Sequence, residues 1–181
     1  MPPHDSDRAP RLHVTFVCSG NICRSPRGDV VLRDLLDGAG LGGQVVVDSA
    51  GTGSWHVGDG ADPRTVTVLA AHGHDGGHHV ARQFTADWFD GRDLVLAADS
   101  GHVQTLVGLA RTDAERGRIR LVREFDPAAV AAGDLETADP WYGGGEDFGR
   151  CYREVEAACR GLVEELRTRL DQAADGHGVR R

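Results

Sequence analysis

Short apolar runs along the chain alternate with longer segments in which apolar residues return every three or four positions. The runs that predict β-strands are residues 12–17, 45–47, 94–96 and 119–122. Helical spacing is found at Val31, Leu32, Leu35 and Leu36, at residues 63–72, and at Val103, Leu106 and Val107. Because strands and helices alternate, the pattern predicts an α/β fold, with one four-stranded parallel sheet flanked by helices on both faces.

The longest periodic segment lies near the C-terminal end, where apolar residues between positions 148 and 170 share one face of a predicted helix. The connection before it, residues 126–147, is rich in glycine, proline and acidic residues, and its length is typical of a functional loop. No internal repeat or linker divides the chain. We therefore predict one domain over residues 11–172, a disordered arm over residues 1–10 and a flexible tail over residues 173–181.

The composition narrows the function. A chain of 181 residues can bury a hydrophobic core without disulfides or a structural metal. The net charge of -8 argues against nucleic-acid binding, and no apolar run is long enough to cross a membrane. All 20 basic residues are arginine, which excludes Schiff-base and P-loop chemistry that depends on lysine. Because residues 1–10 lack the apolar core of a signal peptide, we expect a cytoplasmic protein.

The loop after the first strand carries the candidate chemistry. Cys18 stands where a parallel strand gives way to a helix, the position at which open α/β sheets bind ligands. Backbone N–H groups and the positive end of the helix dipole converge there, which suits a phosphate dianion. The same field favours the thiolate of Cys18 and makes it a nucleophile. Arg24, six residues on, can bind two phosphate oxygens with its planar guanidinium group.

The other residues of this predicted phosphate loop, residues 18–25, fit the same role. Gly20 and Asn21 tolerate the left-handed conformations that a tight loop requires. Ser25 can donate a hydrogen bond to the cysteine sulfur when it leaves. Ser19, Ile22 and Cys23 complete the predicted substrate-binding loop.

The run Cys-Ser-Gly-Asn-Ile-Cys-Arg-Ser-Pro after an N-terminal strand resembles the low-molecular-weight protein tyrosine phosphatases. Residues 49–58, 79–83 and 139–143 resemble further segments of that family, in the family's order. The resemblance implies the family's fold and the hydrolysis of phosphotyrosine in a protein substrate through a cysteinyl phosphate on Cys18. Inorganic phosphate is the implied product, no cofactor is implied, and a bacterial tyrosine kinase is one protein substrate that it suggests.

The resemblance also implies roles for residues outside the loop. Asp139, before Pro140, is expected to lie over the phosphate loop, to protonate the leaving oxygen and then to activate water. Trp55, Trp141 and Tyr142 are expected to form the slot for the substrate ring. His79 is expected to brace Asn21 without touching the substrate, and Cys18 and Cys23 resemble a reversible disulfide pair of the family.

Two departures from the family pattern stand out. Relatives usually have an apolar residue, alanine and glutamate where this chain has Arg27, Gly28 and Asp29, and the glycine weakens the first helical turn. Trp141 replaces a common tyrosine, which leaves Tyr142 as the one family-like phosphorylation site of its loop.

Two other functions stay open, and a metal site is a third alternative. Cys18 and Cys23 are spaced like half a zinc site and four histidines cluster at positions 72–79, but no second closely spaced cysteine pair follows, so we expect no metal. A thioredoxin-coupled arsenate reductase shares this loop but needs downstream cysteines, and Cys151 and Cys159 come late, on the apolar face of the last helix. A non-catalytic phosphotyrosine-binding module would keep Arg24 and tolerate loss of the nucleophile.

Overall fold

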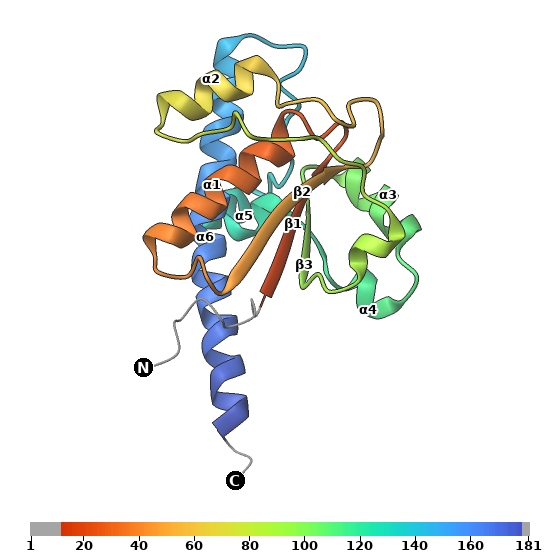
Figure 1. Cartoon of the computed structure of the whole chain (residues 1–181), viewed down its shortest axis with the longest axis vertical. Helices are drawn as coiled ribbons and strands as arrows, with labels where there is room; N and C mark the ends of the chain where they lie inside the picture. The colour runs from red at the N-terminus through yellow and green to blue at the C-terminus, as the bar shows by residue number, and fades with distance from the viewer. Residues whose placement is uncertain (1–11, 179–181) are drawn as a thin grey trace.

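Four parallel strands form one sheet in the order β2-β1-β3-β4, as Figure 1 shows in part. The strands are β1 (Leu12–Cys18), β2 (Val45–Gly51), β3 (Leu94–Ala97) and β4 (Ile119–Leu121). The structure is a computed structural model that describes the backbone of residues 12–178 and the side chains of residues 12–175. The predicted arm, residues 1–10, lies outside the described residues. The predicted four-stranded parallel sheet is confirmed.

Helices connect and cover these strands. They are α1 (Arg24–Gly38), α2 (Pro63–Ala71), α3 (Ser100–Leu109), α4 (Asp113–Arg116), α5 (Pro127–Ala132) and α6 (Gly145–Gly178), with short 3-10 turns η2 (Ala86–Phe89) and η3 (Val122–Phe125). Helices α1 and α6 lie on one side of the sheet and α3 and α4 on the other (Figure 1). None of the helices within residues 12–178 combines the length and the hydropathy that a membrane crossing requires.

The sheet separates two apolar cores because successive side chains of a strand point to opposite faces. Val14 and Phe16 of β1 pack into the core that α1 and α6 cover. Val17 of β1 packs on the other face, with Phe89 from η2 and Leu106 from α3. Strand β3 is buried along its whole length, which explains why it reads as an uninterrupted apolar run in the sequence.

The departures at positions 27–29 have a packing role. A Cβ atom on Gly28 would overlap the ring of Phe16, so the glycine lets α1 lie directly against β1. Arg27 is fully buried and its guanidinium group contacts a sulfur atom of α6. The glycine therefore weakens the helix locally but permits the close approach of α1 to the sheet.

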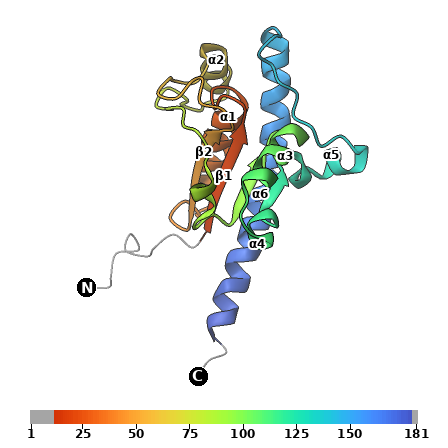
Figure 2. The same ribbon diagram turned by 90° about the vertical axis from the view of Figure 1, so that its right-hand side faces the viewer.

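Two segments differ from the predictions. The connection predicted over residues 126–147 contains α5, because Asp126 caps the helix, Pro127 begins it and Gly133 ends it with a φ of 67°. The apolar face of the last helix is predicted between positions 148 and 170 and a flexible tail over residues 173–181, whereas α6 continues to Gly178 and projects beyond the sheet (Figures 1 and 2). Residues 171–175 include two alanines and no proline, so nothing in them breaks the helix.

Candidate active site

The phosphate loop joins the end of β1 to the start of α1, at the carboxyl edge of the sheet. Cys18 is the last residue of β1, and its Sγ atom lies 3.0 Å from Ser25 Oγ in the first turn of α1. Asn21 has a φ of 58°, the one positive φ of a non-glycine residue within residues 12–178. This left-handed residue turns the chain sharply, so that the loop closes on the N-terminus of α1.

Asn21 holds the back of the loop. Its Nδ2 atom donates to Ser25 Oγ at 2.8 Å and to Ser49 Oγ at 3.0 Å. Its Oδ1 atom accepts from the backbone N–H of Arg82 at 2.9 Å, and its backbone carbonyl accepts from His79 Nε2 at 2.6 Å. Because Ser25 Oγ accepts from Asn21, its own hydrogen is free to point at the sulfur of Cys18.

His79 contacts the phosphate loop as the neutral imidazole. Burial lowers the pKa of His79, the hydrogen bond to the Asn21 carbonyl opposes that effect, and the charge of Arg82 adds to the lowering. A carbonyl oxygen only accepts, so the Nε2 atom of His79 carries the hydrogen. His79 therefore contacts Asn21 as predicted, and the contact is made with the backbone carbonyl of Asn21.

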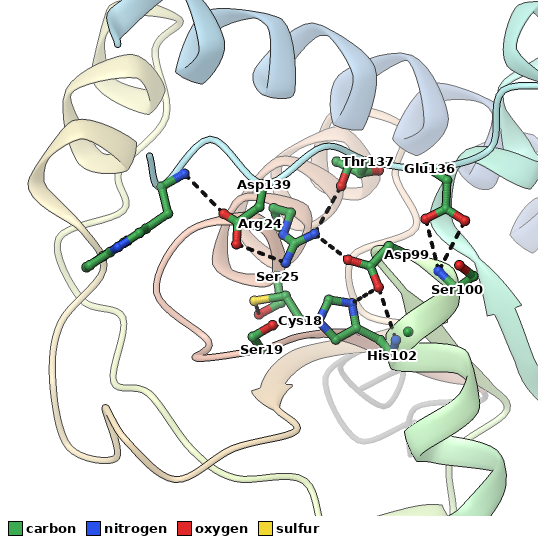
Figure 3. A network of polar contacts seen from close by, with 12 residues as sticks. Cys18, Ser19, Arg24, Ser25, Asp99, Ser100, His102, Glu136, Thr137 and Asp139 are labelled. Atoms are coloured by element: carbon green, nitrogen blue, oxygen red, sulfur yellow. Dashed lines mark hydrogen bonds and ion pairs between the residues drawn. The ribbon is translucent and has the colours of Figure 1, made fainter. Parts of the chain in front are cut away.

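Arg24 begins α1 and is almost fully buried. Its Nη1 atom donates to Asp99 Oδ2 at 2.7 Å and to the carbonyl of Thr137 at 3.0 Å, and its Nη2 atom lies 3.4 Å from Asp139 Oδ2 (Figure 3). Burial would lower the pKa of Arg24, but the negative charges of Cys18, Asp139 and Asp99 outweigh burial and raise it. The guanidinium group is therefore a permanent positive charge beside the cysteine.

Asp139 reaches the loop from the connection between α5 and α6. Its Oδ1 atom accepts from the backbone N–H of Trp141 at 3.1 Å, which fixes the carboxylate near Arg24 (Figure 3). The backbone N–H of Thr137 donates to the carbonyl of Ala98 at 2.9 Å and anchors this connection to the end of β3. A segment far along the sequence is thus held over the phosphate loop.

One pocket contains most of the predicted site residues. It is lined by Cys18, Ser19, Gly20, Ile22, Cys23, Arg24, Trp55, His56, Asp139, Trp141 and Tyr142. Trp55 and Tyr142 are 74% and 95% exposed, so these two pocket residues are largely open to solvent. The predicted binding residues Asn21 and Ser25 are buried and do not line the pocket; they hold the loop from behind.

Three residues near the loop were absent from the predictions. His56 lines the pocket beside Gly20, where a Cβ atom would lie 2.8 Å from the His56 ring, and its one sequence signal is its place after Trp55. Asp99 and His102 lie at the start of α3, directly after β3. Since the carboxyl ends of parallel strands meet at one edge, an acidic residue at that position could have been noticed.

Asp99 is ionised in this setting. Burial would raise the pKa of Asp99, but the imidazole of His102 and the guanidinium group of Arg24 outweigh burial and lower it. A permanent carboxylate therefore faces a permanent guanidinium group.

The remaining cysteines and histidines do not converge on the pocket as a cluster. Burial, followed by the charge of Asp62, raises the pKa of Cys23 to about 12, so its thiol is neutral. Cys151 and Cys159 are buried in α6. His72 and His74 pack on Tyr152. Within residues 12–178 no group of three or more histidine, cysteine or acidic side chains is arranged to hold a metal ion.

Fold and site together define a class of protein. A parallel α/β sheet presents a buried thiol and a buried guanidinium group on one loop at its carboxyl edge, under an acidic side chain. Such an arrangement binds an oxyanion beside a nucleophile.

Comparison with known proteins identifies the family. The family model described as low molecular weight phosphotyrosine protein phosphatase matches residues 13–172. A low molecular weight protein-tyrosine-phosphatase of Streptomyces coelicolor is 52% identical over 161 residues, which cover 89% of this chain and 97% of the relative. The low molecular weight protein-tyrosine phosphatase A of Mycobacterium tuberculosis is 42% identical over 159 residues, 88% and 94% of the two chains. The chain belongs to the low molecular weight phosphotyrosine protein phosphatase family.

Solved structures agree with this assignment. A protein tyrosine phosphatase from Entamoeba histolytica, with Hepes in its active site, has a TM-score of 0.81 and 29% identity, and the match covers 87% of this chain and 97% of that chain. Wzb from Vibrio vulnificus, in complex with benzylphosphonate, has a TM-score of 0.74 and 27% identity, with 86% and 99% covered.

Proposed function

We propose that this chain hydrolyses phosphotyrosine in protein substrates, with Cys18 as nucleophile, Arg24 as phosphate ligand and Asp139 as general acid and base. As a member of its family it is a protein-tyrosine-phosphatase, a phosphoric monoester hydrolase. The observation that carries the assignment of residues is that these three side chains line one pocket at the N-terminus of α1.

In the first step the thiolate of Cys18 attacks phosphorus while the bond from phosphorus to the tyrosine oxygen breaks. Asp139 enters this step as the protonated acid, after a phosphate oxygen has replaced it on Arg24, and gives its proton to the tyrosine oxygen, so tyrosine leaves as the neutral phenol. Arg24 and the backbone N–H groups of the loop bind the phosphoryl oxygens, whose charge they stabilise during transfer. This step leaves a cysteinyl phosphate and an ionised Asp139.

In the second step Asp139 takes a proton from water, and the oxygen of that water attacks the cysteinyl phosphate. The bond between sulfur and phosphorus breaks, and Cys18 leaves as a thiolate. Ser25 supports this departure because its hydroxyl lies 3.0 Å from the sulfur and can donate to it. Inorganic phosphate and the starting enzyme are the products.

The aromatic mouth of the pocket supports selection of phosphotyrosine. Cys18 is 3% exposed, so a phosphate must reach inward past the rings of Trp55, Trp141 and Tyr142. A phosphotyrosine side chain has that reach and offers a ring that can stack on these residues, whereas phosphoserine is shorter. The Vibrio vulnificus neighbour binds benzylphosphonate, which likewise joins an aromatic ring to a phosphorus oxyanion.

The finer predictions from the sequence stay predictions. A tyrosine kinase as the protein substrate and the cytoplasm as the location rest on the sequence alone. Arsenate reduction is less favoured, because Cys151 and Cys159 are buried in the packing of α6 and do not line the pocket.

The test is steady-state phosphate release from a phosphotyrosine peptide and its phosphoserine twin, without added metal. We expect cleavage of the phosphotyrosine peptide alone, no turnover by Cys18→Ser, and a loss of about 10² in kcat or more for Asp139→Asn. The asparagine keeps the shape of the side chain and removes its proton, so it isolates the acid function. Equal cleavage of both peptides, or full activity of Cys18→Ser, contradicts the proposal.

A further inference from the structure

Two residues at the start of α3 connect the opposite ends of the phosphate loop. Asp99, the N-cap of α3, accepts from Arg24 with one carboxylate oxygen at 2.7 Å. Its other oxygen accepts from the backbone N–H of His102 at 3.1 Å and lies 3.0 Å from the Nδ1 atom of that ring. The Nε2 atom of His102 lies 2.8 Å from Ser19 Oγ. A polar chain therefore runs from Ser19 through His102 and Asp99 to Arg24 (Figure 3).

Two members of this chain are buried, and Ser19 and Asp99 are partly buried. His102 and Arg24 are each 5% exposed, so water competes little for their contacts. The ring contact from His102 Nδ1 to Asp99 is short but poorly aligned for a hydrogen bond, so the ring acts on the carboxylate by electrostatic attraction, beside the hydrogen bond from its backbone N–H. His102 does not line the pocket, while Ser19 and Arg24 do. Any effect of His102 on a bound phosphate must therefore pass through its neighbours.

The contacts of Arg24 show what the chain orients. Asp99 and the carbonyl of Thr137 both accept from the Nη1 atom of Arg24. The Nη2 atom reaches Asp139 at the longer distance of 3.4 Å, and no hydrogen bond within residues 12–178 uses the Nε atom. The edge formed by Nε and Nη2 is thus left for two phosphate oxygens. A planar guanidinium group makes two such bonds at once when its plane is held in register with them.

We propose that His102 is a positioning residue, which sets the plane of Arg24 through Asp99 and joins that ion pair to Ser19 in the pocket wall. The proposal rests on the function proposed above. The charge on the equatorial phosphoryl oxygens is shared most closely with Arg24 in the transition state. Loss of the orientation therefore lowers kcat more than it weakens substrate binding.

The test compares His102→Ala with two conservative variants. His102→Ala removes the ring contacts with Asp99 and Ser19 and keeps the backbone hydrogen bond to Asp99. We expect it to lower kcat for a phosphotyrosine peptide about tenfold, with KM changed by less than about twofold. In His102→Asn the side-chain amide can take the place of Nδ1 and donate to Asp99, so most of kcat returns. In His102→Gln the amide extends toward Ser19 instead, so less of it returns. Thr105→Ala, an exposed position of the same helix, is the control for α3 and leaves kcat unchanged.

A binding measurement separates this proposal from the proposed function. Vanadate binds as a five-coordinate mimic of the transition state and orthophosphate as the product, and calorimetry measures both without turnover. We expect His102→Ala to weaken vanadate binding about as much as kcat and phosphate binding clearly less. Vanadate affinity equal to the wild type in folded His102→Ala, or equal impairment of His102→Asn and His102→Ala, overturns the positioning role. A wild type that binds vanadate but releases no phosphate from phosphotyrosine contradicts the proposed function instead.

Discussion

The two sides of the phosphate loop are held by different kinds of contact. The front consists of Cys18, Arg24 and Asp139, which line the pocket, and of Asp99 beside Arg24, and it is held together mainly by the two ion pairs of Arg24. The side chain of Asp139 is 43% exposed, and its Oδ2 atom lies as far as 3.4 Å from the Nη2 atom of Arg24. An ion pair this long and this open to water is weak, so a phosphate oxygen can replace it.

The back consists of Asn21, Ser25, Ser49, His79 and the backbone of Arg82, and its contacts are hydrogen bonds. Asn21 is fully buried and all of its polar side-chain atoms have partners. Breaking one of these bonds leaves a buried polar atom without a partner, which is costly. The difference indicates that the front exchanges partners during the reaction while the back preserves the shape of the loop.

The largest expected effect is at the front. Arg24→Lys keeps the charge but loses the planar pair of donors, so we expect kcat for a phosphotyrosine peptide to fall by about 10² to 10³. Because the charge still faces Asp99, Tm should move by no more than about 4 °C, equivalent to about 1 kcal/mol at this size. Kinetics and thermal melting measure the two quantities. A large drop in Tm would mean that the front also holds the fold and would remove the distinction.

A change at the back should reduce stability and activity together. Asn21→Ala removes three side-chain hydrogen bonds and places a Cβ-bearing residue without a local polar partner at a φ of 58°. We expect the free energy of unfolding to fall by about 2 to 5 kcal/mol and kcat to fall at least about tenfold. Denaturant unfolding and kinetics provide the measurements. Asn21→Gly removes the same hydrogen bonds but tolerates the positive φ, so its free energy of unfolding should be about 1 kcal/mol higher than that of Asn21→Ala. Equal values for the two variants would mean that the lost hydrogen bonds account for the whole effect.

The same contrast explains what the sequence predicts well. Strand β3 is predicted because a buried parallel strand reads as an uninterrupted apolar run, and β1 because it is mostly apolar, broken only by His13 and Thr15. The loop from Cys18 to Ser25 is contiguous, so one short segment carries most of its chemistry. Position 139 is foreseen only through the resemblance to a family, since no local pattern distinguishes it from other acidic residues of its connection.

What the sequence hides are contacts between distant segments. Asp99 and Arg24 are 75 positions apart, and His102 and Ser19 are 83 apart. Hydrophobic periodicity reports the local face of a helix and carries no information about such pairings. Helix α5 is a different case, because the Asp126-Pro127 start and the Gly133 end are visible signals in the sequence.

A smaller change behind the loop should affect stability alone. In Gly28→Ala the new methyl group meets the ring of Phe16, which is buried. We expect the free energy of unfolding to fall by about 1 to 3 kcal/mol, with kcat of the folded enzyme near that of the wild type. Gly38→Ala, at the end of α1, is the matched control, since nothing lies within 4 Å of its Cβ position. There alanine should stabilise the helix by up to about 1 kcal/mol. Equal stability of the two variants would show that the Phe16 ring shifts to make room for the methyl group.

The smallest expected effect concerns pH and His79. Its pKa lies below the ordinary value of 6.5 because burial disfavours the charged ring, so the unfolded chain binds the proton more readily. The contribution of neutral His79 to stability is therefore complete above pH 6.5 and is lost as the pH falls through the lowered pKa. In His79→Gln the amide can still donate to the carbonyl of Asn21 and does not titrate, so this acid loss should disappear.

Thermal melting between about pH 5 and pH 8 measures this difference. The Tm of the wild type should fall relative to that of His79→Gln as the pH is lowered. The reason is that only the wild type must then either bury a charged imidazole at position 79 or move that ring away from Asn21. His78→Gln, one position earlier and 91% exposed in its side chain, is the control and should melt in parallel with the wild type. Parallel curves for His79→Gln and wild type would mean that protonated His79 is tolerated behind the loop. The back of the loop would then tolerate a charged side chain, as the front does.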